Sequence, residues 1–140
     1  MKCSAVFVAS ILIVDDEPIV LRLVKAVLNR AGHQVRTAST GEDVCQVAAE
    51  MERIDLLILD YGVSPRERGK HLGKFLSVKR PEMRILRMSG WPSLPNFEVD
   101  GDLSRKAAFL AKPFTAERLR SAVSAALALA VSWIVELAGG

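Results

Sequence analysis

Five side chains that suit the binding of a charged group stand at the ends of four apolar runs. Asp15 and Asp16 follow ILIV, Asp60 ends DLLILD, Ser89 ends RILRMS and Lys112 ends AFLAK. Neighbouring carboxylates repel one another and raise each other's pKa. A hard divalent cation such as Mg²⁺ relieves that repulsion because it prefers oxygen ligands, whereas zinc sites need Cys or His clusters that this chain lacks. A hydroxyl and an ammonium beside the carboxylates suit a phosphoryl group attached to one of them.

Each of these residues also has an ordinary structural explanation when taken alone. An Asp after a strand is often a helix N-cap, and a Ser at a strand end is often a turn residue. The joint placement of such residues at four strand ends is what favours a common site. We expect the neighbouring Glu17 to favour the start of a helix rather than to bind the ion.

The elements that must position these residues alternate between strands and helices. The apolar runs are too uniform for one-sided strands and suit parallel strands covered on both faces. We predict strands at 11–14, 33–39, 55–60, 84–89 and 108–112, with 33–39 near an edge. We predict helices over 18–31 and 41–51, around 72–79, in part of 91–107, and from the cap Thr115 onward. The expected fold is α/β, a doubly wound five-stranded parallel sheet with five helices.

The composition agrees with one globular domain. The chain has 140 residues, half of them hydrophobic, and a net charge of +3 without a dense Lys/Arg run, so we expect no nucleic-acid partner. Cys3 and Cys45 lack metal-like spacing and are expected to be reduced thiols of a cytoplasmic protein. Residues 1–10 are expected to form a leader and not a signal peptide, since their apolar run ends in acids without a cleavage site.

As a set, the strand-end motifs resemble the receiver domain of two-component response regulators. The resemblance rests on VDDEP at 14–18, LILD at 57–60, MSG at 88–90 and AKPF at 111–114, and covers about residues 11–127. It implies a flavodoxin-like fold and a phosphoacceptor that receives its phosphoryl group from a histidine kinase or a phosphotransfer protein. The stretches around Ser89 and Lys112 look most like receivers attached to hybrid sensor histidine kinases. The chain is then a free-standing receiver or a piece of a longer protein.

The resemblance also implies a role for each site residue. Asp60 would accept the phosphoryl group, and Asp16, with Asp15 partly through water, would bind Mg²⁺ together with Asp60 and the backbone carbonyl of Gly62. Ser89 and Lys112 would each contact a phosphoryl oxygen. Two further positions follow from the same comparison: Phe109 stands where the family keeps an aromatic switch residue, and Trp91 stands where side chains gate access to the phosphoryl group.

The sequence departs from the family pattern after the acceptor. Pro65 and Gly69 keep their usual mutual spacing but lie one residue farther from Asp60, and the loop 66–70 is basic. A basic loop there would reshape access to the acceptor or recognise an acidic partner, unless it is simply a solvated loop. Phe109 lacks the hydroxyl of the usual Tyr, so it would switch by packing alone or serve as a plain core residue. The stretch 91–105 matches the family poorly.

The last predicted helix is longer than a receiver needs. Residues 128–140 form an apolar extension, and from 121 to 138 the only charge is Glu136. A helical stripe runs along this region, made of Leu119, Val123, Leu127, Ala130, Ile134 and Leu137 and widened by Leu129 and Trp133. We expect extra burial of this helix, either by a homodimer partner or by back-packing on the domain, rather than membrane contact.

Three functions follow from these residues. The first is a phosphorylatable receiver with no output domain in this chain, which is not an enzyme beyond its own phosphorylation and slow dephosphorylation. The second is a small Mg²⁺-dependent phosphotransferase or phosphatase with Asp60 or Asp15 as nucleophile, although 140 residues leave little for a cap over the substrate. The third is a pseudo-receiver used only for protein contacts, against which the presence of all five site residues argues.

Overall fold

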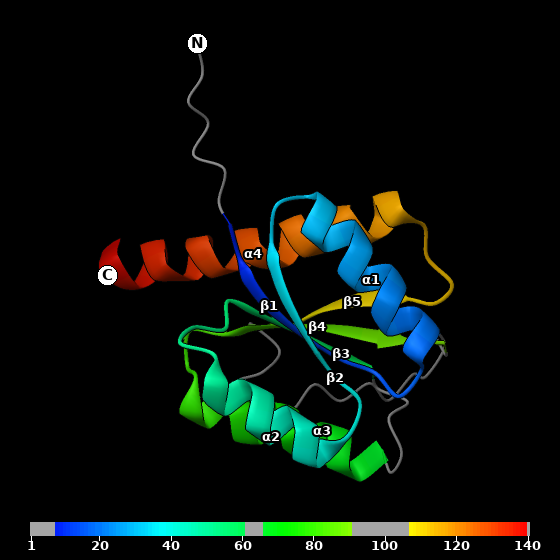
Figure 1. Ribbon diagram of the computed structural model, residues 1–140. Coiled ribbons are helices and arrows are strands. Elements are labelled where there is room, and N and C mark those ends of the chain that lie inside the picture. Colours follow the sequence, from blue (N-terminus) through cyan, green and yellow to red (C-terminus); the bar gives the residue numbers. More distant parts are fainter. Residues whose placement is uncertain (1–7, 61–65, 91–106, 140) are drawn as a thin grey trace.

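A single parallel sheet of five strands forms the centre of the computed structural model (Figure 1). The structure describes residues 8–60, 66–90 and 107–139. It describes only the backbone of 66–71, Ser89, Ala107 and 129–139. The strands are β1 (Ser10–Val14), β2 (Gln34–Ala38), β3 (Leu56–Asp60), β4 (Arg84–Ser89) and β5 (Ala107–Ala111), in the order β2-β1-β3-β4-β5. The predicted doubly wound parallel sheet is confirmed, and so is the edge position of β2.

Helices cover both faces of the sheet. The described residues contain α1 (Pro18–Arg30), α2 (Gly41–Glu50), α3 (Arg66–Lys79) and α4 (Ala116–Gly139). α1 and α4 lie on one face and α2 and α3 on the other (Figure 1). This split follows from right-handed crossovers, because the chain moves one way from β1 to β2 and the other way from β3 to β4. The fifth predicted helix falls within 91–107, of which 91–106 lie outside the described residues.

Both faces of the sheet are apolar, which explains the uniform strand sequences. β3 is buried over its whole length. Alternate strand residues serve opposite sides: Ile58 packs in the cluster under α1 and α4, and Leu57 packs in the cluster under α2 and α3. β3 carries only apolar residues before its end, and its first acid is Asp60.

The first helix begins and ends as its sequence predicts. Pro18 occupies the first turn, where its missing N–H is not needed. Gly32 follows the last turn with a φ of +97°, a left-handed conformation that glycine adopts without strain. Glu17 stands at the N-cap position, but its side chain makes no capping hydrogen bond. Glu17 therefore stands at the start of the helix as expected, without a capping hydrogen bond from its side chain.

The third helix differs from the prediction at its beginning. We expected a basic loop over 66–70, and the structure places these residues in the first turns of α3. Arg66, Arg68 and Lys70 are therefore helical and not loop residues. Deeper in the helix, Leu76 is buried and Gly73 lies against the sheet, where an added Cβ would meet Leu59 at 3.5 Å and Ile85 at 3.8 Å.

Side chains cap both ends of α2. The Thr40 hydroxyl accepts a hydrogen bond from the Asp43 N–H at 3.2 Å. At the other end, the guanidinium of Arg80 donates to the carbonyls of Ala48, Met51 and Glu52 at 2.8, 2.6 and 2.9 Å. These contacts satisfy backbone groups that a helix leaves without internal partners.

We predict that Thr40→Ala lowers the free energy of unfolding by about 1 kcal/mol, because one N–H of the first turn of α2 loses its acceptor. Urea denaturation measures the change. Thr40→Ser keeps the hydroxyl and should retain most of the stability. Equal losses in both variants would show that the methyl group, and not the cap, matters.

Candidate functional site

The candidate site lies at the carboxyl edge of the sheet. In the strand order β2-β1-β3-β4-β5, the chain reverses its direction of travel between β1 and β3, and open α/β sheets bind ligands beyond the carboxyl ends of strands at such a point. β1 leads into Asp15 and Asp16, β3 ends in Asp60, and β5 leads into Lys112. The sheet thus brings residues that are up to 97 positions apart to one edge.

The three acids meet there as predicted. Each of Asp15, Asp16 and Asp60 offers a carboxylate oxygen, and these oxygens lie within 4.8 Å of one another. Asp15 is fully buried and Asp60 is 5% exposed, whereas Asp16 is exposed. Two acids are therefore fixed in the protein, and the third faces solvent.

Lys112 joins the buried acids. Its Nζ lies 2.9 Å from Oδ2 of Asp15 and 3.5 Å from Oδ2 of Asp60, so one ammonium from β5 bridges the acids that follow β1 and β3. Its side chain is 17% exposed, which shields the pairs from solvent. The following peptide bond, between Lys112 and Pro113, is cis.

Backbone hydrogen bonds hold Asp15 in place. Its Oδ1 accepts a bond from the Glu17 N–H at 2.8 Å, and its own N–H donates to the carbonyl of Ala38 at 3.2 Å. Both oxygens of the buried carboxylate are thus engaged, one by the backbone and one by Lys112. Asp15 is a rigid member of the cluster.

The charges of the cluster are not balanced by Lys112 alone. Burial raises the pKa of Asp15 to about 6, and Asp60 adds to the rise, while the hydrogen bonds from Glu17 and Lys112 oppose it. For Lys112, burial acts to lower the pKa, but the hydrogen bond and negative charge of Asp15, with the charge of Asp60, outweigh it and the pKa is raised. The cluster therefore holds its one cation tightly and still carries excess negative charge.

These properties fit a hard divalent cation. Three carboxylate oxygens within 4.8 Å can face one ion, and oxygen is the donor that Mg²⁺ takes. One member is exposed, which leaves room for water or a phosphoryl oxygen. The acidic cluster can thus hold a metal ion, with Asp15, Asp16 and Asp60 as its ligands.

The remaining predicted site residues are placed only in part. Ser89 is the last residue of β4, level with Ala111 of β5, and only its backbone is described. Phe109 lies on β5 and is 42% exposed, so it is not a plain core residue. Its neighbours Ala108 and Leu110 pack toward α1 and α4, which puts Phe109 on the other face. Gly62 and Trp91 lie outside the described residues.

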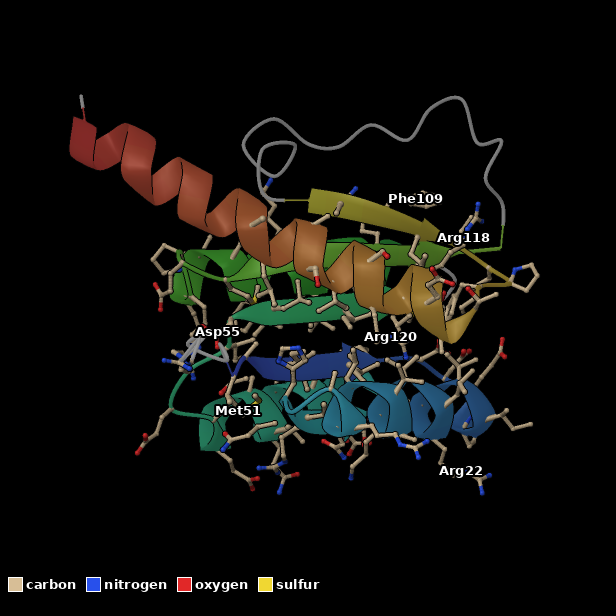
Figure 2. The ribbon with its side chains drawn as sticks, turned by 90° about the horizontal axis from the view of Figure 1, so that it is seen from above. Arg22, Met51, Asp55, Phe109, Arg118 and Arg120 are labelled. Carbon is tan, nitrogen blue, oxygen red and sulfur yellow. The ribbon has the colours of Figure 1, made fainter. Side chains whose placement is uncertain are left out.

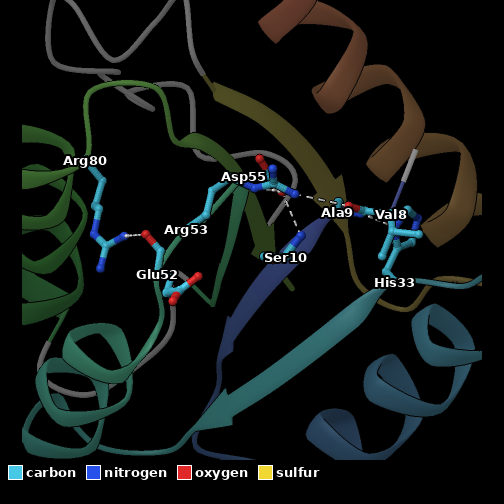
Figure 3. Close-up of polar contacts among 8 residues, drawn as sticks. All are labelled: Val8, Ala9, Ser10, His33, Glu52, Arg53, Asp55 and Arg80. Atoms are coloured by element: carbon cyan, nitrogen blue, oxygen red, sulfur yellow. Dashed lines mark hydrogen bonds and ion pairs between the residues drawn. The ribbon is translucent and has the colours of Figure 1, made fainter. Parts of the chain in front are cut away.

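The sequence did not predict a second polar cluster. His33, Arg53 and Asp55 meet around the start of β1 (Figure 3), at the amino edge of the sheet and away from the acidic cluster. Asp55 was treated only as the first residue of a predicted strand. No spacing rule links residues 22 positions apart on two connecting segments, so the sequence carried no signal for it.

Comparison with known proteins identifies the class. Residues 11–124 match the family model of the response regulator receiver domain, and the chain belongs to this family. Receiver domains are the signalling modules of two-component systems.

Several relatives are similar over most of the chain. Sporulation initiation phosphotransferase F of Bacillus subtilis is 31% identical over 119 residues, which cover 85% of this chain and 94% of that protein. The DNA-binding transcriptional regulator NtrC of Azospirillum brasilense is 33% identical over 119 residues, also 85% of this chain. The chain spans only 24% of the length of NtrC.

Solved structures give the same result. A response regulator receiver domain protein from Clostridium thermocellum superposes with a TM-score of 0.72 at 29% identity, covering 86% of this chain and 94% of that one. NtrX from Brucella abortus superposes with a TM-score of 0.80 at 27% identity, covering 95% of this chain and 29% of that one. TrrA from Thermotoga maritima, solved in complex with Mg²⁺ and BeF, has a TM-score of 0.68 at 25% identity and covers 84% and 98%.

Across the residues that the structure describes, none of the helices combines sufficient length with a sufficiently apolar sequence for a membrane span.

Proposed function

We propose that this chain is the phosphoacceptor receiver of a two-component or phosphorelay system, phosphorylated on Asp60 with the help of Mg²⁺. The observation that carries the proposal is the Lys112 ammonium between Asp15 and Asp60, beside three carboxylate oxygens within 4.8 Å. Structural cores rarely bury two carboxylates at one strand edge, whereas phosphoryl transfer needs this combination of charges.

In the transfer, a carboxylate oxygen of Asp60 attacks the phosphorus atom carried by a histidine of the donor protein. The new P–O bond forms as the P–N bond breaks, and the imidazole leaves with the electron pair. A Mg²⁺ ion held by Asp15, Asp16 and Asp60 would supply positive charge for the phosphoryl oxygens. Lys112, whose Nζ lies 3.5 Å from Oδ2 of Asp60, supplies a second positive charge, and Ser89 donates a hydrogen bond to a phosphoryl oxygen.

Further roles belong to the same proposal. Asp16 is the solvent-facing Mg²⁺ ligand, and the carbonyl of Gly62 completes the protein ligands. Phe109, which is exposed on β5, changes its packing with phosphorylation, and Trp91 gates access to the phosphoryl group.

The donor is a histidine kinase or a phosphotransfer protein of the cytoplasm. The similarity of this chain to Sporulation initiation phosphotransferase F over 94% of that protein supports a role in phosphoryl transfer. The similarity to NtrC and NtrX, of which the chain spans about a quarter, equally suits a receiver within a longer regulator. The assignment of this receiver to a hybrid sensor histidine kinase rests on the sequence resemblance alone.

Incubation with acetyl phosphate tests the proposal, with intact-protein mass spectrometry as the readout. We expect a labile gain of one phosphoryl group in Mg²⁺ and none in excess EDTA. Turnover of an added phosphoester without an adduct would instead indicate a phosphatase. The absence of both an adduct and Mg²⁺ binding would indicate a pseudo-receiver.

We propose that the C-terminal extension forms a homodimer contact and that the receiver proper ends at 127. The leader expected over 1–10 is shorter than predicted, because Ala9 is buried in the core and Ser10 is the first residue of β1. α4 is about 36 Å long at 1.5 Å per residue, whereas the strands beneath it have five or six residues. It therefore runs past the amino edge of the sheet (Figures 1 and 2). Up to residue 128, where the side chains of α4 are described, Leu119, Val123 and Ala126 are buried.

We predict that Ile134→Glu, within the apolar stripe, shifts the protein from dimer to monomer, because it places a charge in the contact. Light scattering across a dilution series measures the mass. Ser132→Glu, about half a helical turn from Ile134, is the matched control and should leave the dimer intact. A wild-type monomer at every concentration would contradict the proposed dimer.

A further inference from the structure

The start of β1 is held by three side chains, at the edge of the sheet opposite the acidic cluster. The Ala9 N–H donates to Nδ1 of His33 at 3.1 Å, and the Ser10 N–H donates to Oδ2 of Asp55 at 2.7 Å. Nη2 of Arg53 donates to the carbonyl of Val8 at 3.3 Å (Figure 3). We call His33, Arg53 and Asp55 the β1 latch.

The β1 latch holds a segment whose residues pack in the hydrophobic core. The carbonyl of Ala9 accepts from the Gln34 N–H at 2.9 Å, and the carbonyl of Ser10 accepts from the Asp55 N–H at 2.8 Å. Ala9 is fully buried and belongs to the same apolar cluster as Val123 and Ala126 of α4. Release of Ala9 would therefore open the packing between the sheet and the last helix.

The hydrogen bond to His33 requires a neutral imidazole. A backbone N–H can only donate, so Nδ1 must be without a proton and the hydrogen of the ring must sit on Nε2. Protonation of Nδ1 would turn the acceptor into a donor that faces the Ala9 N–H. A bond would be replaced by a repulsive contact between two donors.

The surroundings of His33 keep it neutral near pH 7. Partial burial lowers its pKa, and the negative charge of Asp55 opposes this without cancelling it. Asp55 is itself neutralised in part by Arg53, whose Nε lies 3.1 Å from the same Oδ2 that accepts from Ser10.

We propose that the β1 latch is a pH-sensitive contact that holds Val8 and Ala9 against the sheet. The contact forms when His33 is neutral and is lost when its imidazole takes up a proton. Release frees Val8 and Ala9 from the edge of the sheet and loosens the amino end of β1 beneath α4. The acidic cluster lies at the other end of the strands, so the proposed phosphorylation of Asp60 and this latch are independent.

Hydrogen exchange of backbone amides, followed by NMR on the full chain, tests the latch. Protection of the Ala9 amide, corrected for intrinsic exchange, should fall about tenfold between pH 7.5 and pH 5, which is the expected effect of one lost hydrogen bond. The amides of Leu12 and Ile58 in the core serve as internal references. The Ala9 proton shift should also titrate together with the His33 ring signals.

His33→Asn separates the latch from general acid sensitivity. Its Oδ1 can accept from the Ala9 N–H at any pH, so protection should no longer fall. His71→Asn, at the other histidine of the chain, is the matched control and should behave as the wild type. An unchanged Ala9 protection in the wild type, or the same fall in His33→Asn, would overturn the proposal. If His33→Asn does not fold, the wild-type titration of the Ala9 shift alone decides.

Discussion

Asp60→Ala is expected to abolish the labile phosphoryl gain from acetyl phosphate, to below detection by intact-protein mass spectrometry. Asp60 ends the buried strand β3, is 5% exposed, and is the acid that shares Lys112 with Asp15. Alanine removes the attacking oxygen while Asp15 and Asp16 remain in place. Asp15 is a poor substitute, because both of its oxygens are engaged, one by the Glu17 N–H and one by Lys112.

The control for this variant is Glu82→Ala. Glu82 is exposed and precedes β4 at the opposite edge of the sheet, so its loss should leave the phosphoryl gain unchanged. Circular dichroism of Asp60→Ala establishes that it is folded. A persistent adduct of the same lability in folded Asp60→Ala would assign the acceptor to another residue.

Asp15→Asn is expected to stabilise the metal-free protein at pH 7.5 by about 1–3 kcal/mol and to abolish its response to Mg²⁺. Burial raises the pKa of Asp15 to about 6, from 3.8, so the folded protein holds this proton more tightly than the unfolded chain does. A raised carboxyl pKa means that stability is greatest below about pH 4 and is lost as the pH rises through 6. The amide of an asparagine at this position carries no charge, so its burial has no such cost. Lys112 keeps its ion pair with Asp60, at 3.5 Å.

Urea denaturation in EDTA and in Mg²⁺, at pH 5 and pH 7.5, measures these effects. The wild type should gain stability on adding Mg²⁺, because a ligand that binds only the folded state stabilises it. Asp15→Asn should not, and Glu82→Gln should respond as the wild type. A variant less stable than the wild type in EDTA would show that the pairing of Asp15 with Lys112 outweighs the effect of burying it.

The strands and most of the helix ends were predictable because they depend on local chemistry. The run Ile11–Val14 can only be buried on both sides, and Pro18 and Gly32 restrict the backbone at their own positions. The start of α3 was not predictable in this way. The family pattern implies a loop over 66–70, whereas the helix begins at Arg66. Leu72 and Leu76 pack against the sheet, and this tertiary packing stabilises the helix.

The sequence predicted which residues form the candidate site, but not how their charges are balanced. Strand ends at one edge of a parallel sheet imply that Asp15, Asp16, Asp60 and Lys112 meet. The sequence could not tell that Asp15 is buried and Asp16 exposed, although the two are adjacent. Nor could it tell that Lys112 lies closer to Asp15 than to Asp60.

The sequence by itself thus determined the class of fold and the residues at the carboxyl edge of the sheet, because hydrophobic period and strand ends are properties of short segments. Only the tertiary structure decided which acid is buried, where the ammonium lies and how His33, Arg53 and Asp55 hold the start of β1. Burial and pairing depend on segments that are far apart in the chain, and no local pattern records which of them meet.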